Sequence, residues 1–192
     1  VEAKDLRGDL QTQTKWSDGT SSIEELAEAA RALGLGYIAI TDHTRDLAMA
    51  RGSDEKKLRE QLREIAHINA KLRGFRVLSG AEVNIRRDGS LDISDAMLAQ
   101  LDVVGVAVHA YFDLPRDEMT RRVLRAIENP HVDILFHPNS RQLGRRAAID
   151  IDMDAVIAAA ARTGTVLEIN AQPERLDLTD MQVRRACDAG VK

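Results

Sequence analysis

Three of the five histidines directly follow short apolar segments, in the sequences ITDH, VAVH and ILFH, and Glu82 follows a fourth such segment. Neutral imidazole and carboxylate together are ligands that zinc, manganese and iron take in proteins. One histidine at such a place is more often a hydrogen-bonded structural residue, but three of them with a glutamate indicate a metal site. The residues predicted to form it are His43, Glu82, His109 and His137.

Two glutamines take the corresponding place after the first strand-like segment, in GDLQTQTKWSDG. Side chains alternate between the faces of a strand, so Gln11 and Gln13 are expected on the same side. Two neutral amides at a strand end have the position, but not the chemistry, of a pair of ligands. Other polar residues at the predicted strand ends are Asp18, Asp42 and Asn170.

Arginines cluster in the segments that follow the predicted strands. Arg145 and Arg146 follow the fifth strand, and Arg175 follows the sixth. Charged residues in such segments often only solvate a surface, and that interpretation stays open. Arginine's planar fork also binds phosphate through two parallel hydrogen bonds, so these three residues are predicted phosphate contacts.

Apolar, β-branched segments alternate with amphipathic ones along the chain, which predicts strands alternating with helices. The first helix begins with a capping box, Ser22 with Glu25, and ends at Gly34. The expected strands are DLQTQ and residues 37–40, 75–79, 103–108, 132–136 and 165–169. The expected helices are residues 22–34, 54–72, 94–100, 116–128, 152–163 and 179–189.

This alternation predicts an α/β fold with a parallel sheet covered on both sides. Six βα units favour a TIM-like barrel, whose chemistry collects at the carboxyl ends of its strands. The chain stops at GVK, where a seventh strand is due. We therefore expect residues 1–192 to form one domain, a (β/α)7 barrel with its seventh strand truncated, within a longer chain.

Composition excludes several classes of protein. The net charge is −4 and only 3% of residues are aromatic, which argues against binding nucleic acid by bulk charge or by an extended stacking surface. No apolar run reaches the length of a membrane span, and no GxGxxG or GxxxxGK[ST] loop occurs. Cys187 is the single cysteine, so no disulfide can form within the chain, and its thiol is expected to be buried. A cytoplasmic location is predicted.

GDL-x-T-x-TKWSDG, AITDH, LSGAEVNI, VAVH, LFHPNSRQLGRR and EINAQPERLDL resemble the PHP (polymerase and histidinol phosphatase) family. The resemblance runs over essentially the whole chain and is strongest to the PHP domain of family X DNA polymerases. It implies a distorted seven-stranded barrel that holds up to three manganese or zinc ions. It also implies hydrolysis of phosphoesters, including 3′→5′ exonuclease activity.

The family's ligand pattern can be carried over by position. Its His-x-His motif falls on Gln11 and Gln13, and its last motif, Asp-x-His, would come beyond Lys192. The resemblance therefore implies that one metal site is lost and that a second, using Glu82 with two histidines, is complete. A third keeps two of its three ligands. The implied metal ligands, which are also the implied catalytic residues, are Asp18, His43, Glu82, His109 and His137.

Two classes of function follow from the resemblance. The first is a metal-dependent phosphoesterase acting on DNA 3′ ends, weakened by the glutamines and holding one or two manganese or zinc ions. The second is an inactive module that positions DNA or a polymerase core. A free phosphatase of the histidinol-phosphatase type fits the fold but not the GRR and NAQPERLDL segments. The expected partners are DNA and the polymerase core of a DNA repair protein, with no membrane.

Overall fold

The computed structural model describes residues 2–192 as two compact units, residues 2–82 with 93–104 and residues 83–92 with 105–192. Strands and helices alternate along the chain, as predicted. The strands are β1 (Gly8–Thr12), β2 (Tyr37–Ile40), β3 (Arg76–Asn84), β4 (Val103–Ala107), β5 (Ile134–Leu135) and β6 (Val166–Leu167). Their order is sequential and their pairing is parallel within each unit, which confirms the predicted α/β class.

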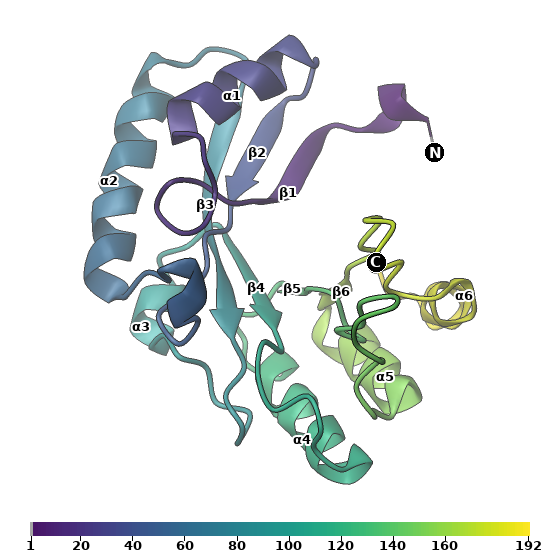
Figure 1. Cartoon of the computed structure of the whole chain (residues 1–192). Helices are drawn as coiled ribbons and strands as arrows, with labels where there is room; N and C mark the ends of the chain where they lie inside the picture. Colours follow the sequence, from purple (N-terminus) through teal and green to yellow (C-terminus); the bar gives the residue numbers. More distant parts are fainter. Residues whose placement is uncertain (1) are drawn as a thin grey trace. The chain divides into compact units, whose positions relative to one another are not determined.

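In the first unit, two helices cover one face of β2 and β3 (Figure 1). These are α1 (Ile23–Ala32) and α2 (Glu55–Lys71), and the same unit contains α3 (Asp95–Leu98) and the short 3₁₀ helices η1 (Ala3–Asp5) and η2 (Ala48–Ala50). Burial of apolar side chains from both helices against the strands stabilises this arrangement. The buried cluster consists of Ile23, Ala27, Ala30, Ile38, Ile40, Ile65, Ile68, Phe75 and Val77.

The predicted end of the third strand at Ser79 is wrong, and β3 is longer than predicted. The strand runs on through Gly80 to Asn84. A Cβ at position 80 would lie 2.6 Å from the Val103 carbonyl oxygen and 3.0 Å from that of Ile40. Glycine here permits close approach of neighbouring backbones rather than marking a turn. Glu82 therefore lies inside the strand rather than in a loop after it.

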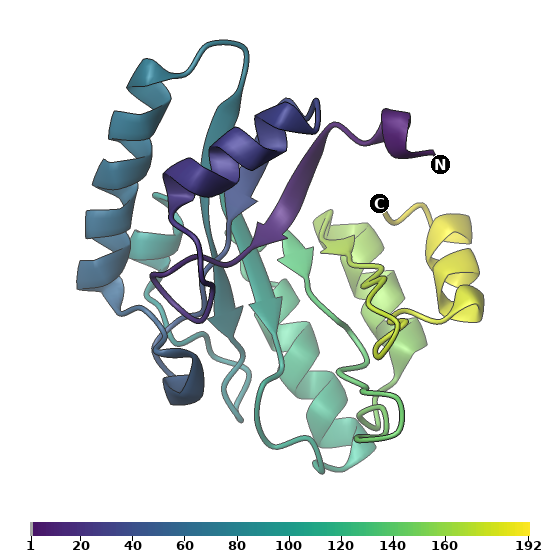
Figure 2. The same cartoon turned by 45° about the horizontal axis from the view of Figure 1, so that its top comes forward.

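In the second unit, α4 (Arg116–Ile127) packs against α5 (Met153–Thr163), and α5 packs against α6 (Asp180–Asp188) (Figure 2). Strands β5 and β6 contain only two residues each, where five were predicted. One further backbone hydrogen bond follows β5, from Phe136 N–H to the Val106 carbonyl oxygen. The chain then turns at His137, whose φ is +31°, so regular pairing ends there.

The helix ends follow the sequence signals closely. Ser22 and Glu25 form the predicted capping box of α1, and Thr179 with Gln182 forms a second at α6. The expected burial of Cys187 is wrong: the cysteine is exposed, because its neighbour Ala186 is the α6 residue that faces inward. Among residues 2–192, none of the helices is long and apolar enough to cross a membrane.

Candidate functional site

Glu82 is the centre of the polar cluster in the first unit. Its side chain is buried within β3, and the amide groups of Gln11 and Gln13 both donate to its Oε2 atom, at 3.2 and 3.0 Å. The two glutamines therefore face the same carboxylate, as their spacing predicted. Hydrogen bonds from two neutral donors stabilise a buried carboxylate that would otherwise be costly to desolvate.

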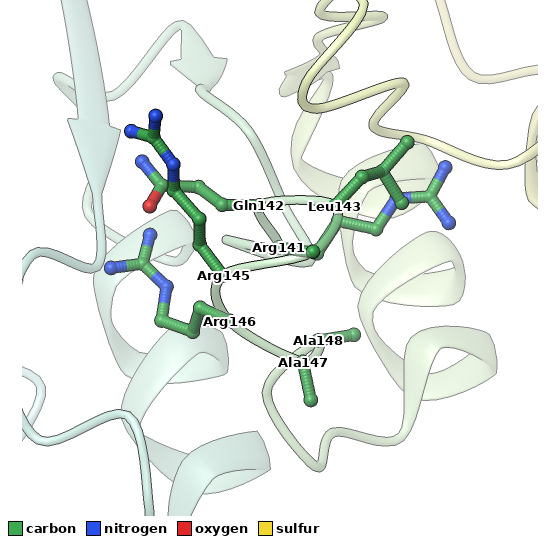
Figure 3. A pocket seen from close by; sticks show the side chains of 8 residues that line it. Arg141, Gln142, Leu143, Arg145, Arg146, Ala147 and Ala148 are labelled. Atoms are coloured by element: carbon green, nitrogen blue, oxygen red, sulfur yellow. The ribbon is translucent and has the colours of Figure 1, made fainter.

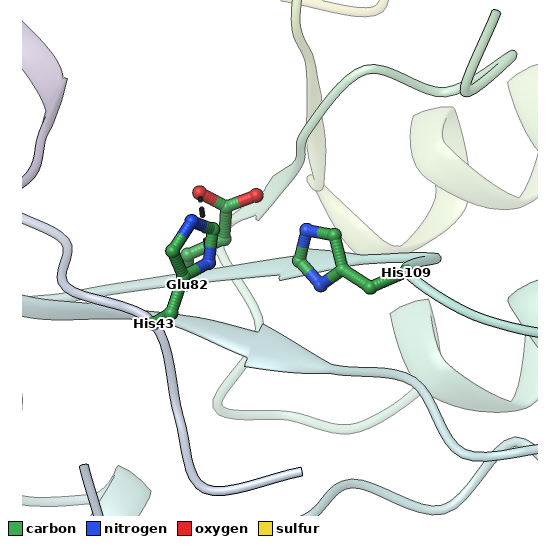
Figure 4. Close-up of side chains that lie close together, drawn as sticks. All are labelled: His43, Glu82 and His109. Atoms are coloured by element: carbon green, nitrogen blue, oxygen red, sulfur yellow. Dashed lines mark ion pairs between the residues drawn. The ribbon is translucent and has the colours of Figure 1, made fainter. Parts of the chain in front are cut away.

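His43 lies beside the carboxylate of Glu82 (Figure 4), and on its other side lies Asp18 of the same unit. Its Nδ1 atom is 3.7 Å from Glu82 Oε2, and its Nε2 atom is 3.8 Å from Asp18 Oδ2. These distances exceed hydrogen-bond length. Two ligand atoms of one ion, each about 2.1 Å from it, lie roughly 3–4 Å apart, so these spacings suit shared ligation. His109, drawn in the same figure, belongs to the second unit.

Asp42, the residue before His43, has a structural task rather than a place in this ligand group. It is fully buried, and its carboxylate accepts from Thr14 N–H at 2.7 Å and Thr14 Oγ1 at 2.6 Å. Ser17 Oγ and Gln61 Nε2 donate to it at 2.5 and 2.6 Å. Asp42 thus fixes the segment that follows β1 and carries Asp18.

In the second unit, His109 is held by a relay of two buried residues. The Asn84 Oδ1 atom is 2.7 Å from His109 Nδ1, and Asp92 accepts both the side-chain amide (2.8 Å) and the backbone N–H (3.1 Å) of Asn84. Because Asp92 receives the amide N–H, the oxygen of Asn84 faces the imidazole and can only accept. The His109 Nδ1 atom therefore donates to Asn84, which fixes the orientation of the ring, as in metal-ligating histidines.

His137 is the buried neighbour of His109. The two imidazole rings meet edge to face, with centroids 5.3 Å apart. The His137 backbone N–H donates to Glu168 Oε2 at 2.5 Å. The segment after it is fixed by Asn139, whose backbone and side-chain N–H groups donate to the buried Asp177 carboxylate. Burial raises the pKa of Asp177, although the bonds from Asn139 oppose this shift.

The predicted phosphate-binding arginines of the second unit lie in and beside a hollow of about 540 Å³ lined by residues 141–148 (Figure 3). The guanidinium groups of Arg145 and Arg146 lie on one side of this loop, and that of Arg141 lies on the other. The Arg146 guanidinium lies 3.8 Å from the Phe112 ring centroid. Burial lowers the pKa of Arg146, and the like charge of the nearby Arg175 lowers it further. Arg175 Nη1 is buried without a hydrogen-bond partner in residues 2–192.

A buried arginine joins the two loops that flank His109. Arg122 on α4 donates to the carbonyls of Arg86 and Ala110 at 2.9 Å each, and also to that of Ile85. Its guanidinium donates to these carbonyl oxygens and, at 3.9 Å, to Met119 Sδ, while burial lowers its pKa to about 10. Arg122 therefore fixes the backbone after β3 and β4.

The structure groups the predicted residues within each unit. Gln11, Gln13, Asp18, His43 and Glu82 lie together in the first unit, and His109 and His137 lie together in the second. The partners that orient them were missed. Asn84 is a polar residue between Val83 and Ile85, which was the available signal. No local pattern indicated that Asp177, 38 residues from Asn139, would bind it.

Replacing Asn84 by alanine should weaken zinc binding about 10–100-fold, because His109 loses the acceptor that fixes its proton on Nδ1. Competition with a chromophoric chelator measures the affinity. Asp92→Ala should have a similar effect, and the double variant should be little worse than either, since both act through one relay. Asn129→Ala, a change at a turn outside the relay, is the control. Unchanged affinity in Asn84→Ala would show that the relay does not prepare His109 for a metal.

Comparison with known proteins relates this geometry to a family. The model of the PHP domain family matches residues 9–171. The crystal structure of histidinol phosphate phosphatase from Lactococcus lactis, a complex with zinc, L-histidinol and phosphate, superimposes with a TM-score of 0.61. That comparison covers 97% of this chain and 82% of the other at 13% identity, and it confirms the PHP fold.

The chain is 42% identical over 191 residues to the DNA polymerase/3′-5′ exonuclease PolX of Bacillus subtilis, of which it spans about a third (34%). It is also 33% identical over 153 residues to a probable phosphatase of Syntrophotalea carbinolica, of which it covers 59%. The first similarity includes the whole of this chain, and the second 78% of it. The chain therefore belongs to the PHP domain family.

Proposed function

We propose that this PHP domain is a metal-dependent phosphoesterase with a reduced metal centre, acting on the 3′ ends of DNA within a PolX-like repair polymerase. The observation that carries the proposal is the relay from Asp92 through Asn84 to His109, which orients the imidazole through its Nδ1 atom, as the supporting hydrogen bonds of a metal-ligating histidine do. A module that only positions other domains does not require a histidine prepared in this way.

We propose Glu82, His109 and His137, a carboxylate with two imidazoles, as the ligands of one metal ion, because the resemblance to the PHP family implies this set. His43 and Asp18, whose nearest atoms are 3.8 Å apart, are proposed as a weaker second site. Zinc or manganese suits both sets.

Gln11 and Gln13 are poorer ligands for a further ion than two histidines would be. Their amide nitrogens donate to Glu82, and their carbonyl oxygens can bind hard cations but lack the affinity of imidazole for transition metals. A complement of one or two ions follows. A bound ion would lower the pKa of a water molecule and polarise a phosphate. A set with fewer ions stabilises less of the charge that develops on phosphate, which predicts slower hydrolysis than in relatives with complete sites.

The loop of residues 141–148, together with Arg175, is proposed to hold the phosphate of the substrate. Arg146 and Arg175 are close enough for Arg175 to lower the pKa of Arg146, so an anion between them would relieve their repulsion. The buried Nη1 of Arg175 offers a donor for that anion. Arg145 is exposed on the same side of the loop as Arg146 and would meet the strand from solvent. DNA as the substrate is supported by the similarity to PolX.

One observation favours the rival proposal, an inactive module that positions DNA or the polymerase core. The two glutamine amides bind Glu82 through hydrogen bonds, so its buried carboxylate is stabilised without any ion. A module that only positions other domains requires a cluster of Gln11, Gln13 and Glu82 that is stable without metal. The two proposals differ in metal content and in hydrolysis.

Elemental analysis and a 3′-end hydrolysis assay separate them. After dialysis we expect about one tightly held ion per chain, and manganese-dependent removal of nucleotides from a labelled 3′ end. His109→Ala should lose the ion and lower the rate at least ~10²-fold, since a ligand to the group that stabilises the transition state is removed. His67→Ala, which removes an exposed histidine of α2, should change neither. DNA binding without any ion, and equal residual rates in all three proteins, would favour the scaffold.

A further inference from the structure

Tyr111 is an exposed aromatic residue in a chain with few aromatic residues. The sequence contains one tryptophan, two tyrosines and three phenylalanines. Tyr111 is the one aromatic among the large apolar side chains that the structure exposes in residues 2–192, with 54% of it open to solvent. It lies two residues after His109, in the same unit, so whatever contacts its ring lies close to that histidine.

The backbone fixes Tyr111 in this exposed position. Its φ is +55°, a left-handed conformation that is uncommon for a bulky residue and is retained only where the surroundings enforce it. Arg122 supplies that enforcement, because its Nη1 group donates to the carbonyls of Ala110 (2.9 Å) and Tyr111 (3.4 Å). The exposed ring is therefore held in place by a buried side chain, rather than being the end of a loose loop.

Arginines surround the ring. The guanidinium carbons of Arg87 and Arg122 lie 5.8 and 6.0 Å from its centroid. Arg87 and Arg122 also line a hollow of about 550 Å³ together with Asp88, Glu118, Arg121 and Arg125. Arg125 is paired with Asp88 at 3.1 Å. Within residues 2–192 neither Arg87 nor Arg121 is paired with a carboxylate, so the hollow carries unpaired positive charge.

We propose that Tyr111 and Arg87 form a subsite for an unpaired nucleobase and its phosphate, next to His109. The base would stack on the Tyr111 ring, and the phosphate would bind Arg87 and Arg121 at the hollow. Aromatic faces accept every base, and guanidinium groups bind phosphate and also stack on bases. The charged lining of the hollow favours a phosphate group over the apolar face of a protein partner.

This inference rests on the proposed function and makes it more specific. A base inside a duplex is already stacked on its neighbours and is not available to Tyr111. The preferred substrate is therefore a single-stranded or frayed 3′ end, rather than a blunt duplex.

Fluorescence anisotropy of a short labelled single-stranded oligonucleotide, measured with EDTA present, tests the subsite without any hydrolysis. Tyr111→Leu keeps an apolar side chain but removes the π face, and it should raise the dissociation constant about 10-fold. Tyr111→Phe should bind like the unaltered protein. Arg87→Gln should weaken binding and reduce its salt dependence. Arg184→Gln, which removes an exposed charge on α6, should do neither.

A second oligonucleotide with an abasic 3′-terminal residue separates stacking from a general structural effect. If Tyr111 stacks on the terminal base, Tyr111→Leu and the unaltered protein should bind the abasic strand equally. An equal loss on both oligonucleotides, or no loss on either, would overturn the inference. Because binding is measured without metal, base-dependent binding with no hydrolysis would contradict the proposed function alone, and hydrolysis without base dependence would contradict this inference alone.

Discussion

Replacing Gln11 and Gln13 together by histidine is expected to raise manganese-dependent removal of nucleotides from a DNA 3′ end by at least ~10²-fold. At present both amides donate to Glu82 Oε2. Histidine would exchange each donor for an imidazole with a lone pair, on the side of β1 that faces Glu82. The expected gain is the scale of one recovered contact to the transition state.

Two controls identify the cause of such a gain. Glu82→Ala in the double-histidine background should abolish it, because the carboxylate is proposed to serve neighbouring ions. Gln100→His places an imidazole at an exposed glutamine of the same unit and should leave the rate unchanged. Equal activity of the glutamine and histidine forms would contradict the interpretation that Gln11 and Gln13 replace metal-binding histidines. It would imply that the glutamines belong to a working site of another design.

The largest effect on stability is expected from Asp42→Asn, which should lower the free energy of unfolding by roughly 3 kcal/mol. The buried carboxylate accepts four hydrogen bonds, two from Thr14 and one each from Ser17 and Gln61. An asparagine has nearly the same shape, but its NH₂ group would face these donors and leave some without an acceptor. Urea denaturation followed by circular dichroism measures the change.

Asp113→Asn, an exposed substitution, is the matched control and should shift the urea midpoint little. Because Asp42 fixes the segment that carries Asp18, its substitution should also weaken the proposed second metal site of Asp18 and His43, while the relay that orients His109 in the other unit stays intact. A stability equal to that of the control would show that the four bonds contribute little net free energy.

The sequence predicts features that depend on local patterns. Helix boundaries follow from apolar periodicity and from caps such as Ser22 with Glu25, and strand ends follow from apolar segments closed by a polar residue, as at His43 and His109. The common orientation of Gln11 and Gln13 follows from the two-residue repeat of a strand. These signals are encoded within a few residues of one another.

What the sequence does not predict depends on contacts between distant residues. Gly80 resembles a turn signal, but it lies inside β3, because its missing Cβ leaves room for carbonyl groups from both sides. Asp42 has the residue type and position of a metal ligand, and only the structure shows that hydroxyl and amide donors occupy it. The role of Asn84 requires Asp92 to fix which end of its amide faces His109.

Arg122 binds the loops beside His109 through their carbonyl oxygens rather than through their side chains. Every amino acid carries such an oxygen, so the side chains of these loops are free to vary in evolution without loss of the loop positions. Arg122 itself does not have that freedom, because lysine lacks the several donors that reach separate carbonyls at once. Side chains at positions such as 87 and 111 can therefore be exchanged without loss of the loop positions, because Arg122 holds the backbone beneath them.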